Sequence, residues 1–325
     1  MSEAVVSTRI RLARNLREYP FPIRLNAEQA KEVVDKVGEA LKDVDMKFHR
    51  IDLSSVSEPL QAAMIERHLI SPDFLSGKEG RAVYLSDDNS VSIMVNEEDH
   101  IRLQVIKDGF ELDEAYALAD KIDNILSKKL NFAFHKRLGY LTQCPTNLGT
   151  GMRASVMLHL PALEMSGTVY RIGANLSKLG LTMRGLYGEG SKPAGAFFQL
   201  SNQVTLGISE KAAIENLRNI TTQLIAQEMR ARDGILNKIE VEDRIWRALG
   251  VLKTARMMNS AEAMKLLSLV RLGVSSKKLE TLSTDSIDKL IVEIQPASML
   301  TRYGDDMTAH ERDVKRAEII RERFQ

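Results

Sequence analysis

Cysteine is almost absent from this chain, and so are long apolar runs. The 325 residues include one cysteine, Cys144, so an internal disulfide is excluded and no cluster of thiols can hold structural zinc. No apolar stretch approaches the roughly 20 residues that a membrane-spanning helix needs. Residues 1–14 carry charges where a signal peptide would be apolar. We therefore expect a cytoplasmic protein that does not enter a membrane.

An excess of charge of either sign is also lacking. The 45 Lys and Arg residues against 44 Asp and Glu residues leave a formal net charge of +1. This balance creates no global field toward nucleic acid or an anionic membrane, so any anion must be bound by a local cluster of side chains. We expect no direct nucleic-acid partner. With 44% hydrophobic residues, the chain can bury an ordinary core.

The common nucleotide-binding motifs are missing. The chain has no Gly-x-x-x-x-Gly-Lys-Ser/Thr loop, and the nearest matches to protein-kinase motifs, His49-Arg50-Ile51-Asp52 and Asp108-Gly109-Phe110, have the wrong order or spacing. His100, His135 and His159 lack the spacing of a metal site, so we predict no metal held by protein side chains alone. A nucleotide would have to be bound in another way.

Residue periodicity predicts a mixed domain followed by a helical one. The predicted helices of the first part cover 26–44 with Asn26 as cap, 57–69, 112–130 with Asp113 as cap, and 209–233. The predicted strands are 83–85 and 91–95, which form a hairpin, then 101–106, 140–142 and 197–205. We therefore place one domain at 1–233 and a small all-helical domain at 234–325, the latter with helices broken at Gly250, Ser260, Gly273, Thr284 and Pro296.

The most informative segment is residues 144–157, which read Cys-Pro-Thr-Asn-Leu-Gly-Thr-Gly-Met-Arg-Ala-Ser-Val-Met. A lone thiol, a turn and an arginine within ten positions have little use in a hydrophobic core. Three other segments belong with it: Ser7-Thr8-Arg9-Ile10-Arg11, Asn96-Glu97-Glu98-Asp99-His100-Ile101-Arg102 and Arg184-Gly185-Leu186-Tyr187-Gly188-Glu189-Gly190-Ser191. These strings predict a functional site rather than packing.

Arginines next to these motifs predict an anion site. Strand alternation puts Arg9 and Arg11 on one face, where two adjacent guanidinium groups repel each other unless an anion lies between them. With Arg102, Arg153 and Arg184, the group can hold several phosphate oxygens bidentately, as a triphosphate requires. Mg²⁺ would then be held mainly by phosphate oxygens and water. The alternative is that each arginine is an ordinary solvated side chain.

Two carboxylates suit a guanidinium substrate. If the strand through Glu98 and Arg102 is continuous, both face one site with about 13 Å between their Cα atoms. Glu189 lies between two glycines in a loop that can close over a ligand. Carboxylates can orient a guanidinium, and one can take its proton as a P–N bond forms. The alternatives are a surface acid at a strand end for Glu98 and a turn residue for Glu189.

The four motifs resemble the catalytic domain of the phosphagen (guanidino) kinases over roughly residues 7–207, and the resemblance is closest to the bacterial protein-arginine kinases. It implies an α+β fold, in which an antiparallel sheet is flanked by helices, and ATP with Mg²⁺ as cofactors. Glu98 and Glu189 are similar to the guanidinium-binding acids, Glu98 being the expected base, and Cys144 to the substrate-side thiol. Taken by itself, Cys144 is more often a buried, unreactive thiol, although nearby arginines should lower its pKa.

The resemblance also implies a set of ATP-binding residues. They are Ser7, Thr8, Arg9, Ile10, Arg11, His68, Arg102, Arg153, Ala154, Ser155, Val156, Met157, Arg184, Gly185, Leu186, Tyr187, Gly188 and Glu189. His68 by its position alone is a helix-end histidine. Small-molecule guanidino kinases have a substantial helical domain before the first motif, whereas here that motif begins at Ser7, so we expect an open substrate face. The start is also short for protein-arginine kinases, and we expect Met1 to reflect a truncation.

The helical tail contains Arg312-Asp313-Val314-Lys315-Arg316-Ala317, which resembles the phosphoarginine-binding motif of protein-arginine kinases. We predict that Arg312, Asp313, Arg316 and Ala317 form a second, allosteric site for phosphoarginine, within a homodimer. The alternative is a solvated helix face on which Glu311, Glu318 and Glu322 relieve the repulsion between the two arginines.

The sequence therefore favours ATP-dependent phosphorylation of arginine residues in proteins. The resemblance further implies marking of proteins for Clp-type degradation, with a heat-shock repressor, a zinc-binding activator protein and a Clp unfoldase as partners. One alternative is a kinase of free arginine or another small guanidine. The other is an adaptor that binds phosphoarginine or the repressor without essential catalysis.

Overall fold

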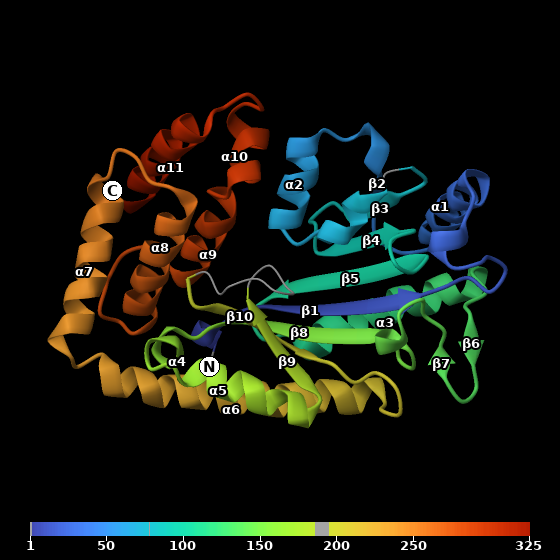
Figure 1. The fold of residues 1–325 in the computed structure, drawn as a ribbon, viewed down its shortest axis with the longest axis horizontal. Coiled ribbons are helices and arrows are strands. Elements are labelled where there is room, and N and C mark those ends of the chain that lie inside the picture. The colour runs from blue at the N-terminus through green and yellow to red at the C-terminus, as the bar shows by residue number, and fades with distance from the viewer. Residues whose placement is uncertain (1, 78, 186–194) are drawn as a thin grey trace.

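The computed structural model describes residues 2–77, 79–185 and 195–325. Its centre is an antiparallel eight-stranded sheet in the order β2-β3-β4-β5-β1-β8-β10-β9 (Figure 1). A separate hairpin pairs β6 with β7. The strands are β1 (Val5–Arg14), β2 (Phe48–Asp52), β3 (Ala82–Ser86), β4 (Val91–Val95), β5 (Ile101–Asp108), β6 (Phe134–His135), β7 (Gly139–Tyr140), β8 (Met152–His159), β9 (Leu181–Gly185) and β10 (Phe197–Asn202).

Helices flank this sheet and form the C-terminal part. Those of the first part are α1 (Ala27–Leu41), α2 (Glu58–Glu66), α3 (Leu112–Lys129), α4 (Pro161–Met165), α5 (Thr168–Leu176) and α6 (Glu210–Ile235). Those of the C-terminal part are α7 (Ile239–Thr254), α8 (Ser260–Ser275), α9 (Thr284–Glu293), α10 (Pro296–Tyr303) and α11 (Ala309–Phe324). The predicted α+β fold, with its helical C-terminal region, is confirmed. No helix among the described residues is long and apolar enough to cross a membrane.

The two faces of the sheet differ in polarity, and this difference positions the site. Along β1, Ile10 and Leu12 are buried in the main core, and α1, α3 and α6 contribute their apolar faces to the same core. Alternation turns Arg9 and Arg11 to the opposite face. On that face α2 covers one end, while the C-terminal helices stand beside the sheet (Figure 1). A polar surface remains between them.

The C-terminal helices share a hydrophobic core with strands β8 and β10 of the sheet. Met157 of β8 and Phe197 of β10 pack into the core formed by α7, α8, α9 and α11. Buried Arg271 of α8 pairs with Asp288 at 2.7 Å and donates to the Glu3 carbonyl at 2.8 Å. Helix α6 passes through the predicted boundary at 233/234 and ends at Ile235.

Several local predictions are confirmed, because capping chemistry is encoded within a few residues. Asn26 caps α1, accepting from the Gln29 amide at 2.8 Å in a capping box. The hairpin of β3 and β4 forms as predicted. New helices begin at Ser260, Thr284 and Pro296.

Other local predictions are wrong. Asp113 does not cap α3, whose N-cap residue is Glu111. Helices α7 and α8 continue through Gly250 and Gly273. Gly273 is used for packing rather than as a break, because a Cβ there would lie 2.6 Å from Cγ2 of Ile245. The strands predicted to reach Thr142 and Thr205 end at Tyr140 and Asn202.

Candidate functional site

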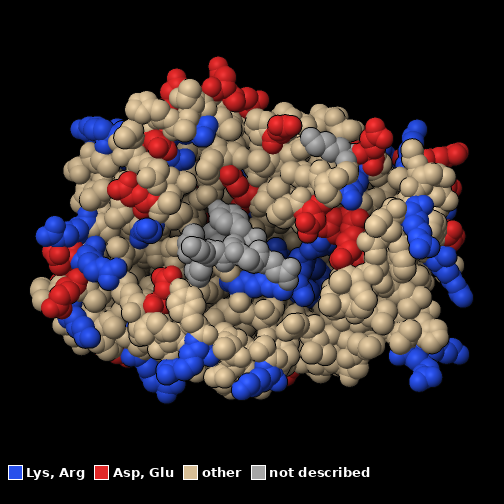
Figure 2. Space-filling model, in the orientation of Figure 1, with Lys and Arg blue, Asp and Glu red and all other residues tan. Residues whose placement is uncertain are grey.

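A cavity of about 500 Å³ opens on the polar face of the sheet. This size suits a small molecule such as a nucleotide. Figure 2 shows Lys and Arg side chains gathered in a hollow at the middle of this face, with acidic side chains beside them. The lining includes Arg9, Arg11, His68, Ser71, Asp73, Glu97, Glu98, Asp99, Arg102, Cys144, Thr146, Asn147, Arg153, Arg184, Gln199 and Ser201.

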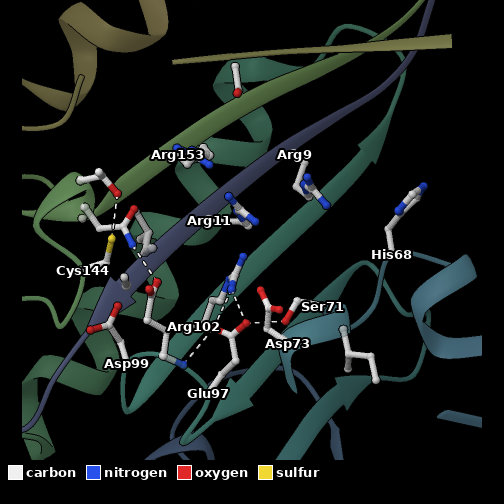
Figure 3. Close-up of a pocket in the computed structure, with 18 of the residues that line it drawn as sticks. Arg9, Arg11, His68, Ser71, Asp73, Glu97, Asp99, Arg102, Cys144 and Arg153 are labelled. Carbon is white, nitrogen blue, oxygen red and sulfur yellow. Dashed lines mark hydrogen bonds and ion pairs between the residues drawn. The ribbon is translucent and has the colours of Figure 1, made fainter. Parts of the chain in front are cut away.

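The five predicted phosphate arginines all line this cavity. The sheet register explains the grouping, because Arg11 of β1 lies opposite Arg153 of β8, and Arg102 of β5 lies opposite Ala13 of β1. Figure 3 shows the side chains of Arg9, Arg11, Arg102 and Arg153 close together on adjacent strands. The positive charge is therefore assembled by strand pairing, not by one contiguous motif.

This arginine cluster is electrostatically unfavourable by itself. Burial, reinforced by Arg102 and Arg153, lowers the pKa of Arg9 to about 10. Burial and the charges of Arg102, Arg9 and Arg153 also lower the pKa of Arg11 well below its usual value, and Glu97 only partly offsets them. A polyanion placed among these groups would relieve the repulsion.

Glu97 fixes Arg102 and was not singled out from the sequence. Nη1 of Arg102 donates to Oε2 of Glu97 at 2.6 Å, and the Ser71 hydroxyl also donates to this carboxylate. Burial opposes the charge of Glu97, but Arg102 and the hydrogen bonds outweigh burial and lower its carboxyl pKa. The sequence feature that could have indicated Glu97 is the Asn-Glu-Glu-Asp-His string that contains it. Nothing in the sequence indicated Ser71 or Asp73, which Figure 3 places beside it.

His68 stands at the opposite end of the cavity from Cys144 (Figure 3). It follows the end of α2 with a left-handed φ of 59°, in agreement with the predicted helix-end position. Burial and the charge of Arg9 lower its pKa to about 4, so the imidazole is neutral at pH 7. A neutral ring can contact a nucleotide without adding to the positive charge.

Glu98 lies in a turn between two strands, so the condition of a continuous strand through Glu98 and Arg102 is not met. β4 ends at Val95, Asn96 takes a left-handed φ of 63°, and β5 begins at Ile101. The carboxylate nevertheless reaches the cavity, where Nδ2 of Asn147 donates to its Oε2 at 3.2 Å. Burial, followed by the charges of Asp99 and Glu97, raises the pKa of Glu98, while Arg102 and a hydrogen bond with Cys144 oppose this rise. A carboxylate with these surroundings suits a proton acceptor.

Cys144 begins the short 3₁₀ turn Pro145–Asn147, and its Sγ lies 3.0 Å from Oγ1 of Thr146. The Thr205 hydroxyl fixes this turn by hydrogen bonds to the Thr146 carbonyl at 2.9 Å and the Leu148 carbonyl at 2.7 Å. Thiol, carboxylate and amide therefore meet at one end of the cavity.

Asp99 and His100 support the Cys144 end of the cavity by hydrogen bonds. The sequence did not indicate this role. Oδ1 of Asp99 accepts from Nδ2 of Asn15 at 2.6 Å and from the Gln143 amide at 2.8 Å, which ties the strand β1 to the Cys144 turn. Nδ1 of buried His100 accepts from the Leu16 amide at 3.0 Å. Burial lowers the pKa of His100 to about 4, so it is a neutral structural side chain.

Some predicted ATP-binding side chains point away from the cavity. Thr8, Ile10, Ala154 and Val156 are fully buried, and the last three belong to the main core. Met157 packs against the C-terminal helices. For these residues and for Ser7, Ser155 and Gly185, a nucleotide role stays a prediction. Leu186, Tyr187, Gly188 and Glu189 lie outside the described residues.

The tail motif lies on α11, and its central arginine is not on a solvated surface. Arg316 is 1% exposed and donates to the carbonyls of Ile294 at 2.9 Å and Met258 at 3.0 Å and to Asp313 at 2.6 Å. Ala317 is also buried. The alternative in which glutamates relieve Arg316 on an exposed face is therefore wrong. Arg312 instead donates to the Met307 carbonyl at 2.7 Å.

No group of three or more His, Cys, Asp or Glu side chains capable of holding a metal occurs in the described part of the chain. If Mg²⁺ enters with a nucleotide, its ligands would be phosphate oxygens and water.

Two family models match this chain. The model of the ATP:guanido phosphotransferase C-terminal catalytic domain matches residues 29–231, and that of the protein-arginine kinase McsB C-terminal domain matches residues 238–325. The first covers every strand of the sheet except β1, and the second covers the C-terminal helices.

Full-length relatives and solved structures agree with these matches. Protein-arginine kinase of Caldanaerobacter subterraneus subsp. tengcongensis is 44% identical over 324 residues, covering 98% of this chain and 96% of the relative. That of Brevibacillus brevis is 47% identical, covering 99% and 92%. A crystal structure of lombricine kinase aligns with a TM-score of 0.65 at 25% identity, covering 72% of this chain and 69% of that one.

A transition-state-analogue complex of duplicated taurocyamine kinase from Schistosoma mansoni also aligns, with a TM-score of 0.64 at 25% identity, covering 94% of this chain and 40% of that one. These enzymes share the fold of this chain. The sequence matches, the fold and the arginine-lined cavity agree, and the chain belongs to the protein-arginine kinases of the ATP:guanido phosphotransferase family.

Proposed function

We propose that this protein transfers the γ-phosphoryl group of ATP to arginine side chains of proteins. The carrying observation is one cavity with two chemically different ends: an arginine cluster with His68, and the group formed by Glu98, Cys144 and Asn147. The first end suits a triphosphate and the second suits a guanidinium. A transferring phosphoryl group would lie between them.

The chemistry follows from these positions. A guanidinium nitrogen of the acceptor attacks the γ-phosphorus, the P–N bond forms, the bond to the β,γ-bridging oxygen breaks and ADP leaves. Glu98 takes the proton that the nitrogen loses, which its raised pKa favours. Cys144 and Asn147 orient the guanidinium, and the arginine cluster stabilises the charge on the phosphoryl oxygens. Mg²⁺ bound to the nucleotide would be held by phosphate oxygens and water and would supply charge neutralisation for the phosphates. Glu189, outside the described residues, serves as a second carboxylate for the guanidinium.

A protein is the proposed acceptor rather than free arginine. This choice is supported by the match of residues 238–325 to a domain described for protein-arginine kinases and by relatives of that name over nearly the full chain. We also propose that Arg312, Asp313, Arg316 and Ala317 bind phosphoarginine as a regulatory site, within a homodimer.

The cellular role is proposed from the same relationship. The enzyme would act in the cytoplasm during stress, mark proteins for a Clp unfoldase and phosphorylate a heat-shock repressor, together with a zinc-binding activator protein.

A competition experiment tests the acceptor. Labelled ATP, a folded protein and free arginine are mixed with the enzyme and with Glu98→Gln. We expect acid-labile, base-tolerant label on the protein, and a loss of about 10²- to 10⁴-fold in rate for the variant because the base is removed. Label on free arginine alone would favour the small-guanidine alternative. Label stable to strong acid would indicate a phosphoester and contradict the proposal.

A further inference from the structure

Helix α10 of the C-terminal part packs against α2 (Figure 1). Ile65 of α2 lines the cavity. Glu66, the last residue of α2, places its carboxylate at the N-terminus of α10. It accepts from the amide of Ala297 at 2.8 Å and from that of Ser298 at 2.7 Å. Hydrogen bonds from backbone amides at a helix N-terminus to a carboxylate are charge-assisted and favoured by the helix dipole. One side chain of the first part thus caps a helix of the second.

Glu66 lies two residues before the segment that lines the nucleotide end. The sheet holds this segment from the other side, because Nε2 of Gln104 donates to the His68 carbonyl at 2.6 Å and Oγ of Ser92 donates to the Leu69 carbonyl at 2.5 Å. Ser71 then donates to Glu97, the partner of Arg102. Residues 66–71 therefore join three structures: helix α10, the sheet and the arginine cluster.

We propose that Glu66 is a positioning residue for the nucleotide. By binding the N-terminus of α10, it fixes the end of α2, and it thereby holds His68 and Ser71 at their places beside the arginine cluster. The inference rests on the proposed function in one respect only, namely that this cavity binds ATP. Its consequence is that docking of the C-terminal helices sets nucleotide affinity.

The tail motif is bonded to the start of the same helix, α10. Arg316 donates to the carbonyl of Ile294, which is two residues before Pro296 at the start of α10. Arg316 and Glu66 therefore both bond to the backbone at the start of the same helix. A change at the tail can reach His68 through this short chain of hydrogen bonds and one helix end.

Calorimetric titration with ATP tests the proposal. Glu66→Gln keeps one carbonyl acceptor but loses the charge, and we expect its Kd for ATP to rise roughly 2- to 30-fold, the range typical of changes along a coupling network. KM for ATP should rise in parallel, while kcat at saturating ATP stays near that of the wild type. Glu58→Ala removes an exposed glutamate from the first turn of the same helix and should bind ATP as the wild type does.

The outcomes separate the inference from the proposed function. Glu66→Ala leaves two amides of buried residues without their acceptor and can unfold the domain contact, so the Gln variant carries the test. If Glu66→Gln loses thermal stability but binds ATP normally, Glu66 is only a structural cap and the inference is overturned. Because calorimetry needs no acceptor, a wild type that binds ATP but phosphorylates no arginine would sink the proposed function alone. A wild type that does not bind ATP would remove both.

Discussion

At the scale of single residues, the proposed chemistry depends on how the surroundings of Glu98 set its charge. Its pKa is raised mainly by burial, while hydrogen bonds to the carboxylate favour the charged form. Asn147 provides such a bond at 3.2 Å. Since only the deprotonated form can accept a proton, activity should be lost as the pH falls through this raised pKa. The acid limb of kcat/KM should therefore lie above the value of about 4.3 for an ordinary glutamate.

Asn147→Ala should move this acid limb to still higher pH, because it removes a donor that stabilises the carboxylate. The measurement is kcat/KM for phosphoryl transfer across pH, compared with Asn124→Ala, which truncates an exposed asparagine of α3. The control should keep the wild-type limb. An unshifted limb in Asn147→Ala would show that Asn147 does not tune the group that titrates.

At the scale of elements, strand pairing creates the repulsion that an anion relieves. Arg11 of β1 and Arg153 of β8 stand opposite each other. The charged form of Arg11 is disfavoured in the folded protein, since its pKa is lowered. This cost is fully present at pH values below the folded-state pKa of Arg11 and decreases as the pH rises above it. The arginine cluster thus lowers the stability of the free enzyme and raises its affinity for an anion.

Arg11→Gln should reveal both effects by changing two quantities in opposite directions. ATP affinity should fall by about 1.5–3 kcal/mol, the usual contribution of hydrogen bonds to charged groups. The free energy of unfolding without nucleotide should rise, because a buried like charge is removed. Calorimetry and denaturant unfolding measure the two quantities, with exposed Arg137→Gln as the matched control. Unchanged affinity would place the phosphates elsewhere.

The same elements explain what the sequence could predict. Alternation along β1 gave the polar and apolar faces correctly, because the side-chain period of a strand is local information. The interruption of the strand at the acids was predicted, but the left-handed turn at Asn96 was not, because it depends on contacts with distant segments: Nδ2 of Asn96 donates to the carbonyl of Ala30 at 2.9 Å. The brace between Asn15 and Asp99 joins residues 84 positions apart, and no spacing rule connects them.

At the scale of the whole molecule, the C-terminal helices are joined to the catalytic sheet by buried polar groups as well as by a core. Nε2 of His159 lies 2.8 Å from the Ser268 hydroxyl, and Nη1 of Arg232 donates to the Ser275 hydroxyl at 2.9 Å. Such fully buried partners leave little freedom for independent motion of the two parts. A ligand that binds to α11 therefore binds to an element that is packed rigidly against the rest of the protein.

The tail motif already contains a partly exposed ion pair that a phosphoarginine could reorganise. Asp313 accepts from Arg316, and its side chain is 28% exposed. A phosphoryl group could take N–H donors of Arg312 and Arg316, while the carboxylate of Asp313 turns to the guanidinium of the ligand. Each half of phosphoarginine would then have a partner of opposite charge.

Asp313→Ala should weaken binding of free phosphoarginine about tenfold or more, since one charge-assisted contact is lost, and should blunt the effect of phosphoarginine on rate. Basal transfer to protein arginine should persist, because the Asp313 carbonyl still accepts from the Met258 amide and holds α11 in place. The measurement is calorimetric titration together with transfer rates, with exposed Asp305→Ala as control and Asp313→Asn to separate charge from folding. If phosphoarginine binds the wild type and Asp313→Ala equally, the ion pair of Asp313 and Arg316 only anchors α11, and regulation through this motif must be rejected.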